Sequence, residues 1–268
     1  VVYSGTSSSW GAYNEFETSV VTPARRGLAV VHETVSGDAM VVSCSSGADP
    51  VYTIWNGLSW TATSSIDVAS TNNCNWLTLA ADPTSDEIIL IYKGIADSYE
   101  AQVWDGDAWS NAIQLGRINV TSPAGTASVA TEGMSVVYED SGDQALVVTT
   151  DGNDNEFRYA TWDGSDWSAV FTVPVSSDFE NGELVRDEGT DRIGFCMVDD
   201  ASDINVFMWD GSAWDVTETQ LEPTTESVQS RPFDCIFETV PGRDGNFAVV
   251  YSDSATDEFQ YFDTAWSG

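Results

Sequence analysis

The segment Trp209-Asp210-Gly211-Ser212-Ala213-Trp214 has the sequence of a tight β-hairpin corner. Asp210 can hydrogen-bond to the backbone just ahead of it, and Gly211 can adopt a positive φ angle at little steric cost. The two Trp residues stand at the ends of the loop, where cross-strand aromatic pairs form. The segment therefore predicts two antiparallel strands whose indole rings pack on each other.

The same corner recurs along the chain. Further copies occur at Trp162–Trp167 and Trp104–Trp109, and a looser copy with Asn in place of Asp occurs at Trp55–Trp60. Degenerate copies stand at the two ends, from Tyr3 to Trp10 and from Phe262 to Trp266. A repeat of about fifty residues with strand-like sequence between the corners is typical of a β-propeller built from one blade per repeat.

Each repeat contains four strand-like segments separated by turn residues. In the fourth repeat, from the innermost strand to the outermost, these segments are Glu183–Arg186, Arg192–Val198, Ile204–Trp209 and Trp214–Thr219. The second segments are almost continuously apolar, as a strand that packs on both faces between neighbouring sheets should be. No segment has a helical pattern.

The repeats predict one all-β domain, residues 1–268, folded as a five-bladed β-propeller of four-stranded antiparallel blades. The predicted blades comprise residues 20–70, 71–122, 123–177, 178–226, and 227–268 together with 1–19. In this arrangement Trp10–Glu17 pairs as the outer strand of the last blade and closes the ring. Val1–Gly5 then has no partner within the ring: it lies over the edge of the ring, pairs with another subunit, or is a loosely held terminus. A ring of six blades is the alternative.

The chain is strongly acidic, with 43 Asp and Glu residues against 9 Lys and Arg residues and a formal charge of −34. Such a charge excludes nucleic acid and anionic lipid as partners, because both require cations that neutralise phosphate. No apolar run approaches the roughly 18 residues of a membrane-spanning helix, so we expect no membrane insertion. The acidic surface suits a salty environment, divalent cations, or simply solubility.

The four cysteines form two close pairs in the sequence. In each pair, one residue lies in a second strand (Cys44, Cys196) and the other in or near the first strand of the next blade (Cys74, Cys235). This repeated relation favours two inter-blade disulfides, Cys44–Cys74 and Cys196–Cys235, and hence an oxidising compartment. Free buried thiols are the alternative. The absence of a Cys-x-x-Cys spacing, together with a single His, argues against a metal site.

The sequence contains no recognisable catalytic constellation, so we predict that the chain is not an enzyme. The single His32 lies at the end of a first strand, where a structural role is expected. Carboxylate pairs are too numerous to indicate a glycosidase, which would require a close, buried pair in the central pit. A sialidase would require an Arg cluster, and only Arg25 and Arg26 are adjacent.

One loop has the oxygen-rich pattern that hard cations prefer. Asp151, Asn153, Asn155 and Glu156 are the candidate ligands, and Ca²⁺ is the candidate cofactor. The loop lacks the Gly and the distant Glu of a helix-flanked calcium loop, so an ordinary hairpin loop is the alternative. Asn119 begins a glycosylation sequon that falls between two blades, although chance also produces such triplets.

The Trp-Asp-Gly-x-x-Trp corner resembles the corner of the fucose-binding lectins of fungi and bacteria, and more distantly the Asp-box turn of sialidases. The lectin resemblance implies a β-propeller in which sugar binds between blades, held by a second-strand Arg, a Glu three residues before the first Trp, and an aromatic platform. Here Tyr52, Ala101, Tyr159 and Val206 stand at the Glu position, and Arg192 is the only second-strand Arg.

The leading functional prediction is a non-catalytic extracellular or cell-surface propeller that acts in adhesion or as a structural subunit, with itself as partner in an oligomer or filament. The alternative is a multivalent lectin for surface glycans, and a glycoside hydrolase is the third possibility. The candidate carbohydrate-binding residues are the corner tryptophans Trp55, Trp60, Trp104, Trp109, Trp162, Trp167, Trp209 and Trp214. A structural role for these paired indoles is the competing interpretation.

Overall fold

A computed structural model gives the three-dimensional structure of the chain. It describes residues 1–11, 14–18, 25–45, 49–68, 74–94, 98–117, 131–150, 155–215, 217–225, 231–240, 245–253 and 258–265. In residues 258–265 only the course of the backbone is described. Within these ranges, the secondary structure consists of strands. No helix in the described part of the chain is long and apolar enough to cross a membrane.

Four antiparallel sheets have four strands each. The first contains β3 (Leu28–His32), β4 (Ala39–Ser43), β5 (Val51–Trp55) and β6 (Ser64–Ser65). The second contains β7 (Cys74–Ala81), β8 (Ile88–Gly94), β9 (Ser98–Trp104) and β10 (Trp109–Arg117). The third contains β11 (Met134–Tyr138), β12 (Ala145–Thr150), β13 (Glu156–Trp162) and β14 (Phe171–Pro174). The fourth contains β15 (Phe179–Arg186), β16 (Ile193–Asp199), β17 (Ile204–Trp209) and β18 (Thr219–Glu222).

The remaining strands form two smaller sheets. The fifth sheet contains β19 (Phe233–Phe237), β20 (Asn246–Asp253) and β21 (Glu258–Ala265). A separate hairpin near the N-terminus consists of β1 (Tyr3–Ser4) and β2 (Ser9–Trp10). All strand pairs are antiparallel, which confirms the predicted all-β fold of four-stranded antiparallel sheets.

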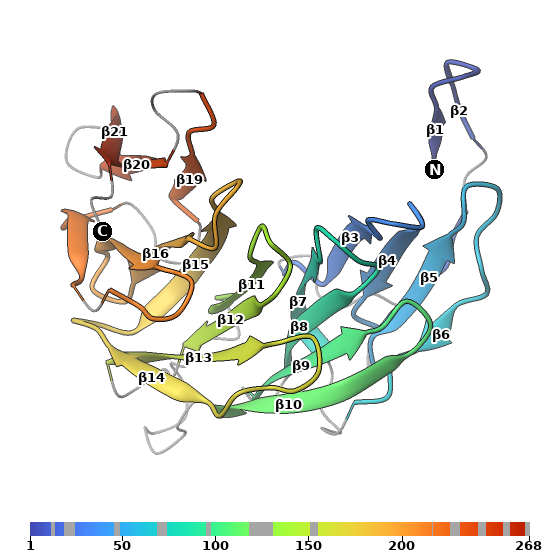
Figure 1. The fold of residues 1–268 in the computed structure, drawn as a ribbon, viewed down its shortest axis with the longest axis horizontal. Coiled ribbons are helices and arrows are strands. Elements are labelled where there is room, and N and C mark those ends of the chain that lie inside the picture. Colours follow the sequence, from blue (N-terminus) through green and yellow to red (C-terminus); the bar gives the residue numbers. More distant parts are fainter. Residues whose placement is uncertain are drawn as a thin grey trace.

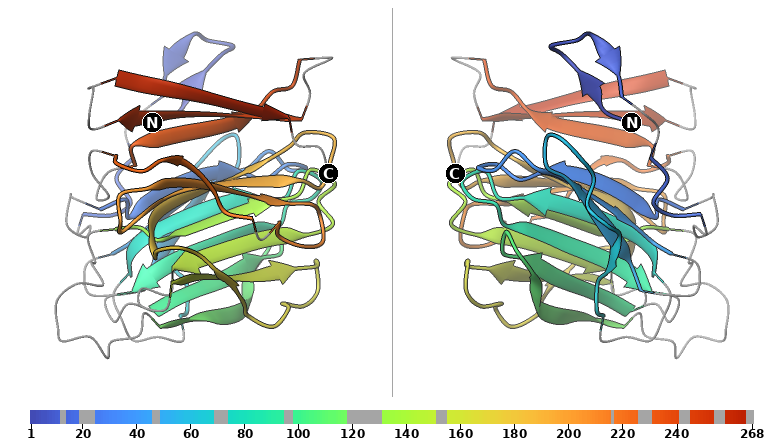
Figure 2. Two further views of the ribbon diagram at one scale, coloured as in Figure 1. Left: turned by 90° about the vertical axis from the view of Figure 1, so that its left-hand side faces the viewer. Right: turned by 90° about the vertical axis from the view of Figure 1, so that its right-hand side faces the viewer.

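The five sheets follow one another around an arc that is open on one side (Figure 1). Their first strands, β3, β7, β11, β15 and β19, are neighbours along the arc. Seen from the side, the strands of successive sheets run across the molecule in stacked layers (Figure 2). The hydrophobic core lies between adjacent sheets in four clusters. Each contact between two sheets is called a junction below, numbered from the N-terminal side.

The second strands of the first four sheets are buried along their whole length, in accordance with their apolar sequences. β8, β12 and β16 each pack with one face against the preceding sheet and with the other against the following sheet. Phe195 in β16, for example, belongs to the core of the third junction, whereas the adjacent Cys196 belongs to the fourth. This arrangement confirms the interpretation of the continuous apolar segments.

The predicted hairpin corners are present. Trp104 and Trp109 are paired in register, and Trp209 and Trp214 form an isolated bridge. In the latter corner Gly211 has a φ of +95°, and Asp210 accepts hydrogen bonds from the backbone N–H groups of Ser212 and Ala213, both at 2.8 Å. These hydrogen bonds to the carboxylate lower the pKa of Asp210.

The outermost strand of the fourth sheet differs from its prediction. The sequence predicted it at Trp214–Thr219, but β18 begins only at Thr219. Between the Trp214 bridge and β18 the chain leaves the ladder, and the pairing of β17 with β18 contains a register shift. The corner motif fixes its own turn but does not determine where pairing resumes beyond it.

The predicted closure of the ring by Trp10–Glu17 is wrong in this structure. Trp10 lies in β2 and pairs with Tyr3 of β1, so it is not the outer strand of the last sheet. Further along, the Phe16 carbonyl accepts a hydrogen bond from Thr63 of the first sheet, at 3.4 Å. The contact between the Tyr3 and Trp10 rings is local in sequence and needs no long loop closure, which favours the hairpin over the distant pairing.

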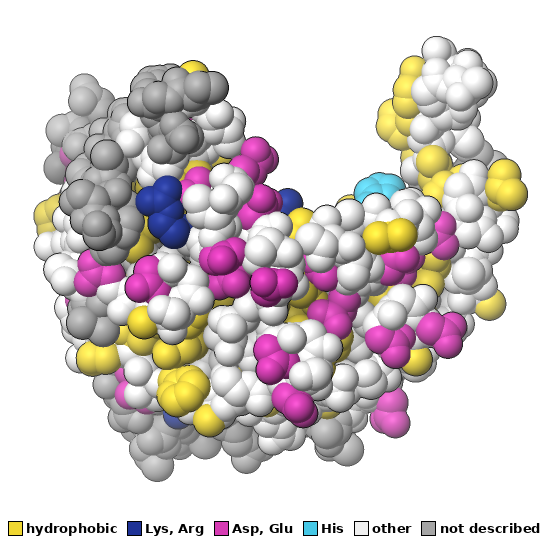
Figure 3. All heavy atoms as spheres, in the orientation of Figure 1, with side chains coloured by type: hydrophobic (Ala, Val, Ile, Leu, Met, Phe, Trp, Pro, Cys, Tyr) yellow, Lys and Arg dark blue, Asp and Glu magenta, His cyan; other side chains and the backbone are white. Residues whose placement is uncertain are grey.

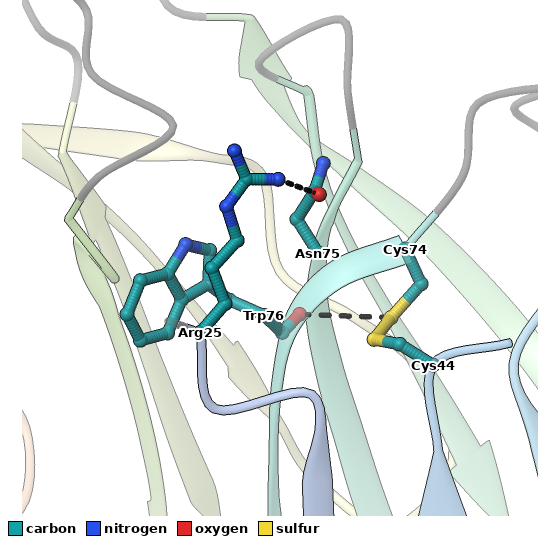
Figure 4. Close-up of a disulfide and its surroundings, with 5 residues drawn as sticks. All are labelled: Arg25, Cys44, Cys74, Asn75 and Trp76. Atoms are coloured by element: carbon teal, nitrogen blue, oxygen red, sulfur yellow. Dashed lines mark hydrogen bonds between the residues drawn. A yellow bond between two sulfur atoms is a disulfide. The ribbon is translucent and has the colours of Figure 1, made fainter. Parts of the chain in front are cut away.

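One of the two predicted disulfides is present. Cys44, just after β4, is bonded to Cys74 at the start of β7 and joins the first two sheets, with 5.1 Å between the Cα atoms (Figure 4). Beside it, Arg25 donates a hydrogen bond to the Asn75 side chain. The predicted Cys196–Cys235 disulfide is absent, because both residues are buried free thiols. The two thiols contact each other across the fourth junction, and burial raises the pKa of Cys196.

Candidate functional site

The first Trp of each full corner is tied to the preceding sheet. The indole N–H groups of these residues donate to Glu carboxylates at 2.6–2.9 Å, in the pairs Trp104–Glu33, Trp162–Glu87 and Trp209–Glu139. All three indoles are buried. A buried donor needs an acceptor, so these hydrogen bonds fix the relative position of adjacent sheets. The first Trp residues are therefore structural in large part.

The Glu partners were not identified from the sequence. Glu33 and Glu139 directly follow the first strands β3 and β11, in the similar segments Val-His-Glu and Val-Tyr-Glu. That similarity between repeats was the available signal. Glu87 stands on the other side of the same kind of turn, where Tyr138 also donates to it at 2.7 Å.

At the fourth junction, the polar contact involves Arg192 and Asp187 instead of a Trp and a Glu. The Nε atom of Arg192 donates to Asp187 at 3.0 Å, and the guanidinium lies over the Phe237 ring, 6.0 Å from its centroid. Asp187 is buried. Arg192 is the one Arg that the lectin resemblance places in a second strand, and it is held in this ion pair. The guanidinium of Arg192 is therefore already paired with a carboxylate of its own sheet.

The hydrogen bonding of the second Trp of each corner differs between the junctions. Trp167 donates to the Asn111 carbonyl at 2.7 Å. The Trp109 and Trp214 indole N–H groups are buried and have no hydrogen-bond partner in the described part of the chain. At the junctions of these two residues, a Tyr ring of the preceding sheet contacts the second Trp. Tyr52 contacts Trp109 at the first junction, and Tyr159 contacts Trp214 at the third.

The third junction carries the fullest aromatic group, here called the third-junction cluster: Tyr159, Phe171, Trp209 and Trp214. Tyr159 and Phe171 are directly opposite each other on β13 and β14, with ring centroids 5.4 Å apart and planes inclined by 32°. Trp209 and Trp214 approach Tyr159 from the next sheet at 5.9 and 6.2 Å. Phe171 is 48% exposed, and hydrophobic side chains gather on the surface over β13 and β14 (Figure 3).

Tyr159 and Phe171 were not among the predicted site residues. The sequence carried no clear signal for Phe171, because the register of the corner, in which Trp162 pairs with Trp167, would place Val170 opposite Tyr159. The pairing of β13 with β14 is shifted by one residue and places Phe171 there. Burial raises the pKa of Tyr159, so its hydroxyl is a neutral donor and acceptor at physiological pH. The cluster thus offers apolar ring surface with a neutral polar group at its edge.

The first junction has a less complete version of this arrangement. Tyr52 contacts Trp104 at 5.6 Å and Trp109 at 6.1 Å, but the residue opposite Tyr52 is Ser64 instead of an aromatic. The second junction has Ala101 in place of the Tyr. Trp55 and Trp60, at the open end of the arc, pack on each other at 5.5 Å.

The candidate cation loop is only partly described. Asp151 and Asn153, like the sequon residue Asn119, lie outside the described residues. Asn155 donates to the Ser176 carbonyl at 3.3 Å, and Glu156 opens β13. Among the described residues, no group of three or more His, Cys, Asp or Glu side chains is arranged to hold a metal. Calcium binding at this loop stays a prediction.

Glu139 predicts a pH dependence of stability. Burial raises the pKa of its carboxyl from 4.5 to about 7, although the hydrogen bond from Trp209 opposes this shift. Because the folded state then binds a proton more tightly than the unfolded state, the contribution of Glu139 to stability is fully present below about pH 4.5 and is lost as pH rises through 7. We expect Glu139→Gln to remove part of this decrease, by about 1–3 kcal/mol between pH 5 and pH 8.

The measurement is urea unfolding of both proteins at the two pH values. The Gln side chain keeps an acceptor for Trp209 but does not ionise, so the comparison isolates Glu139 from the other acids. Asp199, whose pKa burial raises to about 6, contributes to the same slope in both proteins. Equal slopes for the two proteins would contradict the assignment.

No protein-family model and no curated protein sequence matches the chain. Among solved structures, a lectin from Burkholderia pseudomallei matches with a TM-score of 0.61 and 14% identity over 90% of this chain and 67% of its own. The Aleuria aurantia lectin in complex with alpha-methyl-L-fucoside matches with a TM-score of 0.54 and 16% identity over 90% of this chain and 74% of its own. A further structure of the Aleuria aurantia lectin, described as a six-bladed β-propeller with a novel mode of fucose recognition, matches at 15% identity, with a TM-score of 0.54.

These similarities show that the chain has the β-propeller fold of fucose-binding lectins. The fold does not by itself give the number of blades. The arc of five sheets is open, and the comparison fold has six blades. The alternative of six blades therefore agrees with the comparisons better than a closed ring of five.

Proposed function

We propose that this protein is a carbohydrate-binding lectin and that the third-junction cluster is its principal sugar site. The observation that carries the proposal is the pair formed by the half-buried Tyr159 and the exposed Phe171, in contact with Trp214, whose buried indole N–H has no acceptor among the described residues. Aromatic faces bind the apolar C–H face of a sugar ring, while a few convergent polar groups fix its orientation. The similarity in fold to lectins supports this function over that of a structural subunit.

The residues favour a neutral sugar. The cluster consists of uncharged side chains, and the chain as a whole carries a formal charge of −34, which repels acidic sugars. Arg192 is engaged by Asp187 and does not provide a cation for a carboxylate. A neutral hexose or deoxyhexose stacked on Phe171 and hydrogen-bonded to the Tyr159 hydroxyl is the ligand that fits.

The Trp214 N–H provides a further source of binding energy. A buried donor without a partner costs about 1–3 kcal/mol, and a sugar hydroxyl that reached it would recover part of this cost. Because this N–H has no accessible surface, binding requires a side-chain movement of the neighbouring rings. Rotamer changes of this kind are common at binding sites.

The proposal extends to location and valency. The Cys44–Cys74 disulfide supports secretion to an oxidising compartment, where surface glycans are the partners. The first-junction residues Tyr52, Trp104 and Trp109 would form a second, weaker site, and two sites on one chain raise avidity for multivalent glycans. We further propose a non-catalytic role. Self-association and calcium dependence are predictions that the binding experiments below can examine.

Phe171→Ala is expected to weaken sugar binding at least tenfold, because it removes half of the exposed platform. The measurement is a titration of the chain with alpha-methyl-L-fucoside and with neutral hexoses, followed by intrinsic Trp fluorescence. The matched control is Leu58→Ala, which removes a side chain that is 88% exposed in another corner. It should bind like the unaltered protein, and both variants should unfold within about 1 kcal/mol of it.

Binding of neutral sugars that is unchanged in Phe171→Ala would place the site elsewhere. In that case Tyr52→Ala distinguishes the first junction from the third. Absence of binding to every sugar tested at millimolar concentration would contradict the lectin proposal itself.

A further inference from the structure

The two ends of the arc present apolar sheet faces to solvent. On the first sheet, Leu28 and Val30 of β3 are 58% and 65% exposed, and on the fifth sheet Ile236 and Val250 are 63% and 42% exposed. Figure 1 shows these two sheets on either side of the opening, and Figure 3 shows the molecule hollowed there. Exposed apolar faces of this kind mark interaction sites.

An internal comparison shows that such a face is normally covered. Met134 and Val136 of β11 occupy the same positions in the third sheet as Leu28 and Val30 do in the first. Both are buried against the second sheet. The face of the first sheet therefore has the composition of a junction, but no sheet in the described part of the chain packs against it.

The outer half of such a preceding sheet is already in place. The β1–β2 hairpin repeats the corner of the other sheets, with Tyr3 opposite Trp10 and ring centroids 5.2 Å apart. Val1, Val2 and Tyr3 line one side of a groove of about 500 Å³, and Val30 and Val41 of the first sheet line the other. In the described part of the chain, β1 pairs only with β2, so its second edge is available to another strand.

The chemistry of Trp55 indicates which side chain a hairpin that covers this face carries. At three junctions the first Trp of a corner donates to a Glu near the turn between the first two strands of the preceding sheet. Trp55 holds the same position in its corner at the open end, and no hydrogen bond joins its indole N–H to another of the described residues. The expected complement is a hairpin with a carboxylate beside its turn.

We propose that the open end binds an antiparallel β-hairpin of a partner polypeptide, which adds the first and second strands of a sixth blade. One strand of the hairpin pairs with the free edge of β1, its apolar face covers Leu28 and Val30, and its carboxylate accepts the Trp55 N–H. Strand addition to an exposed edge, with pockets for alternate side chains, is an established mode of peptide recognition. Two strands are enough to complete the sixth blade, because β1 and β2 already form its outer pair. A second copy of the whole chain would instead bring five sheets.

The probe is a fluorophore-labelled peptide of residues 133–150 of this chain, which contains β11, β12 and Glu139. Within the chain, this hairpin packs against Trp209, which is the first Trp of its corner, as Trp55 is of the corner at the open end. We expect it to bind the full chain with one-to-one stoichiometry by sedimentation velocity and fluorescence anisotropy. Val30→Asp should abolish binding, because it places a charge in the apolar contact, and Val170→Asp, an exposed residue of the third sheet, should leave it unchanged.

Two further variants test the polar contact. A peptide with Glu139→Ala and a chain with Trp55→Phe should each bind about tenfold more weakly, and the two changes together should cost no more than one of them. Absence of binding at 1 mM peptide, or binding that Val30→Asp does not affect, would overturn the proposal. It would also be overturned if the chain alone formed oligomers that Val30→Asp disperses, because a second copy would then occupy the open end.

Discussion

Phe195→Ala is expected to lower the free energy of unfolding by about 3–5 kcal/mol. Phe195 is fully buried in β16 and contacts the rings of Phe157, Phe179 and Trp214 at 5.3–6.0 Å. A Cβ atom on Gly182 would lie 2.5 Å from this ring, so the neighbouring strand is shaped around it. The Ala variant leaves a cavity at the centre of the third junction, which urea unfolding measures.

The contrast with Phe171→Ala makes this prediction specific. Both substitutions remove a Phe side chain at the third junction, but Phe171 is 48% exposed and its loss should cost little stability. Phe195→Ala should also weaken sugar binding, because the ring supports Trp214. Similar unfolding free energies for the two variants would show that the third junction is not packed as described.

Replacing both Cys44 and Cys74 by Ala is expected to cost about 3–4 kcal/mol of stability. The two residues are separated by 30 positions, and their disulfide limits the conformational freedom of the unfolded chain. The unaltered protein should lose a similar amount in the presence of a reducing agent, whereas the double variant should be insensitive to it. Thermal unfolding with and without reductant provides the measurement.

The number of free thiols provides the control for this second prediction. Titration of the denatured protein should detect two thiols, those of Cys196 and Cys235. A protein without free thiols would mean that the second disulfide, predicted from the sequence, forms after all. In that event the double variant would still respond to reductant.

Features set by local sequence could be predicted for this chain. The Trp-Asp-Gly corner specifies its own turn through the Asp210 carboxylate and the positive φ of Gly211, and the structure contains that turn. The buried second strands were visible as continuous apolar segments. These elements depend on residues close in sequence, so a single amino-acid sequence is enough to identify them.

Features set by contacts between distant residues could not be predicted. The Trp209–Glu139 hydrogen bond joins residues 70 positions apart, and nothing in either residue identifies the other. The pairing of Trp10 depended on whether the ring closes, which is a matter of sheet geometry. The candidate site shows the same limit: the eight corner tryptophans were predicted, but the exposed platform residue Phe171 became apparent only from its position opposite Tyr159.

The most direct test of the lectin proposal is a glycan array probed with the purified chain, in millimolar calcium and again after chelation. We predict binding to glycans with neutral terminal sugars in both conditions and loss of that binding in Phe171→Ala. Acidic glycans should be among the weakest ligands because of the charge of the chain. An array that stays blank with and without calcium would contradict the account.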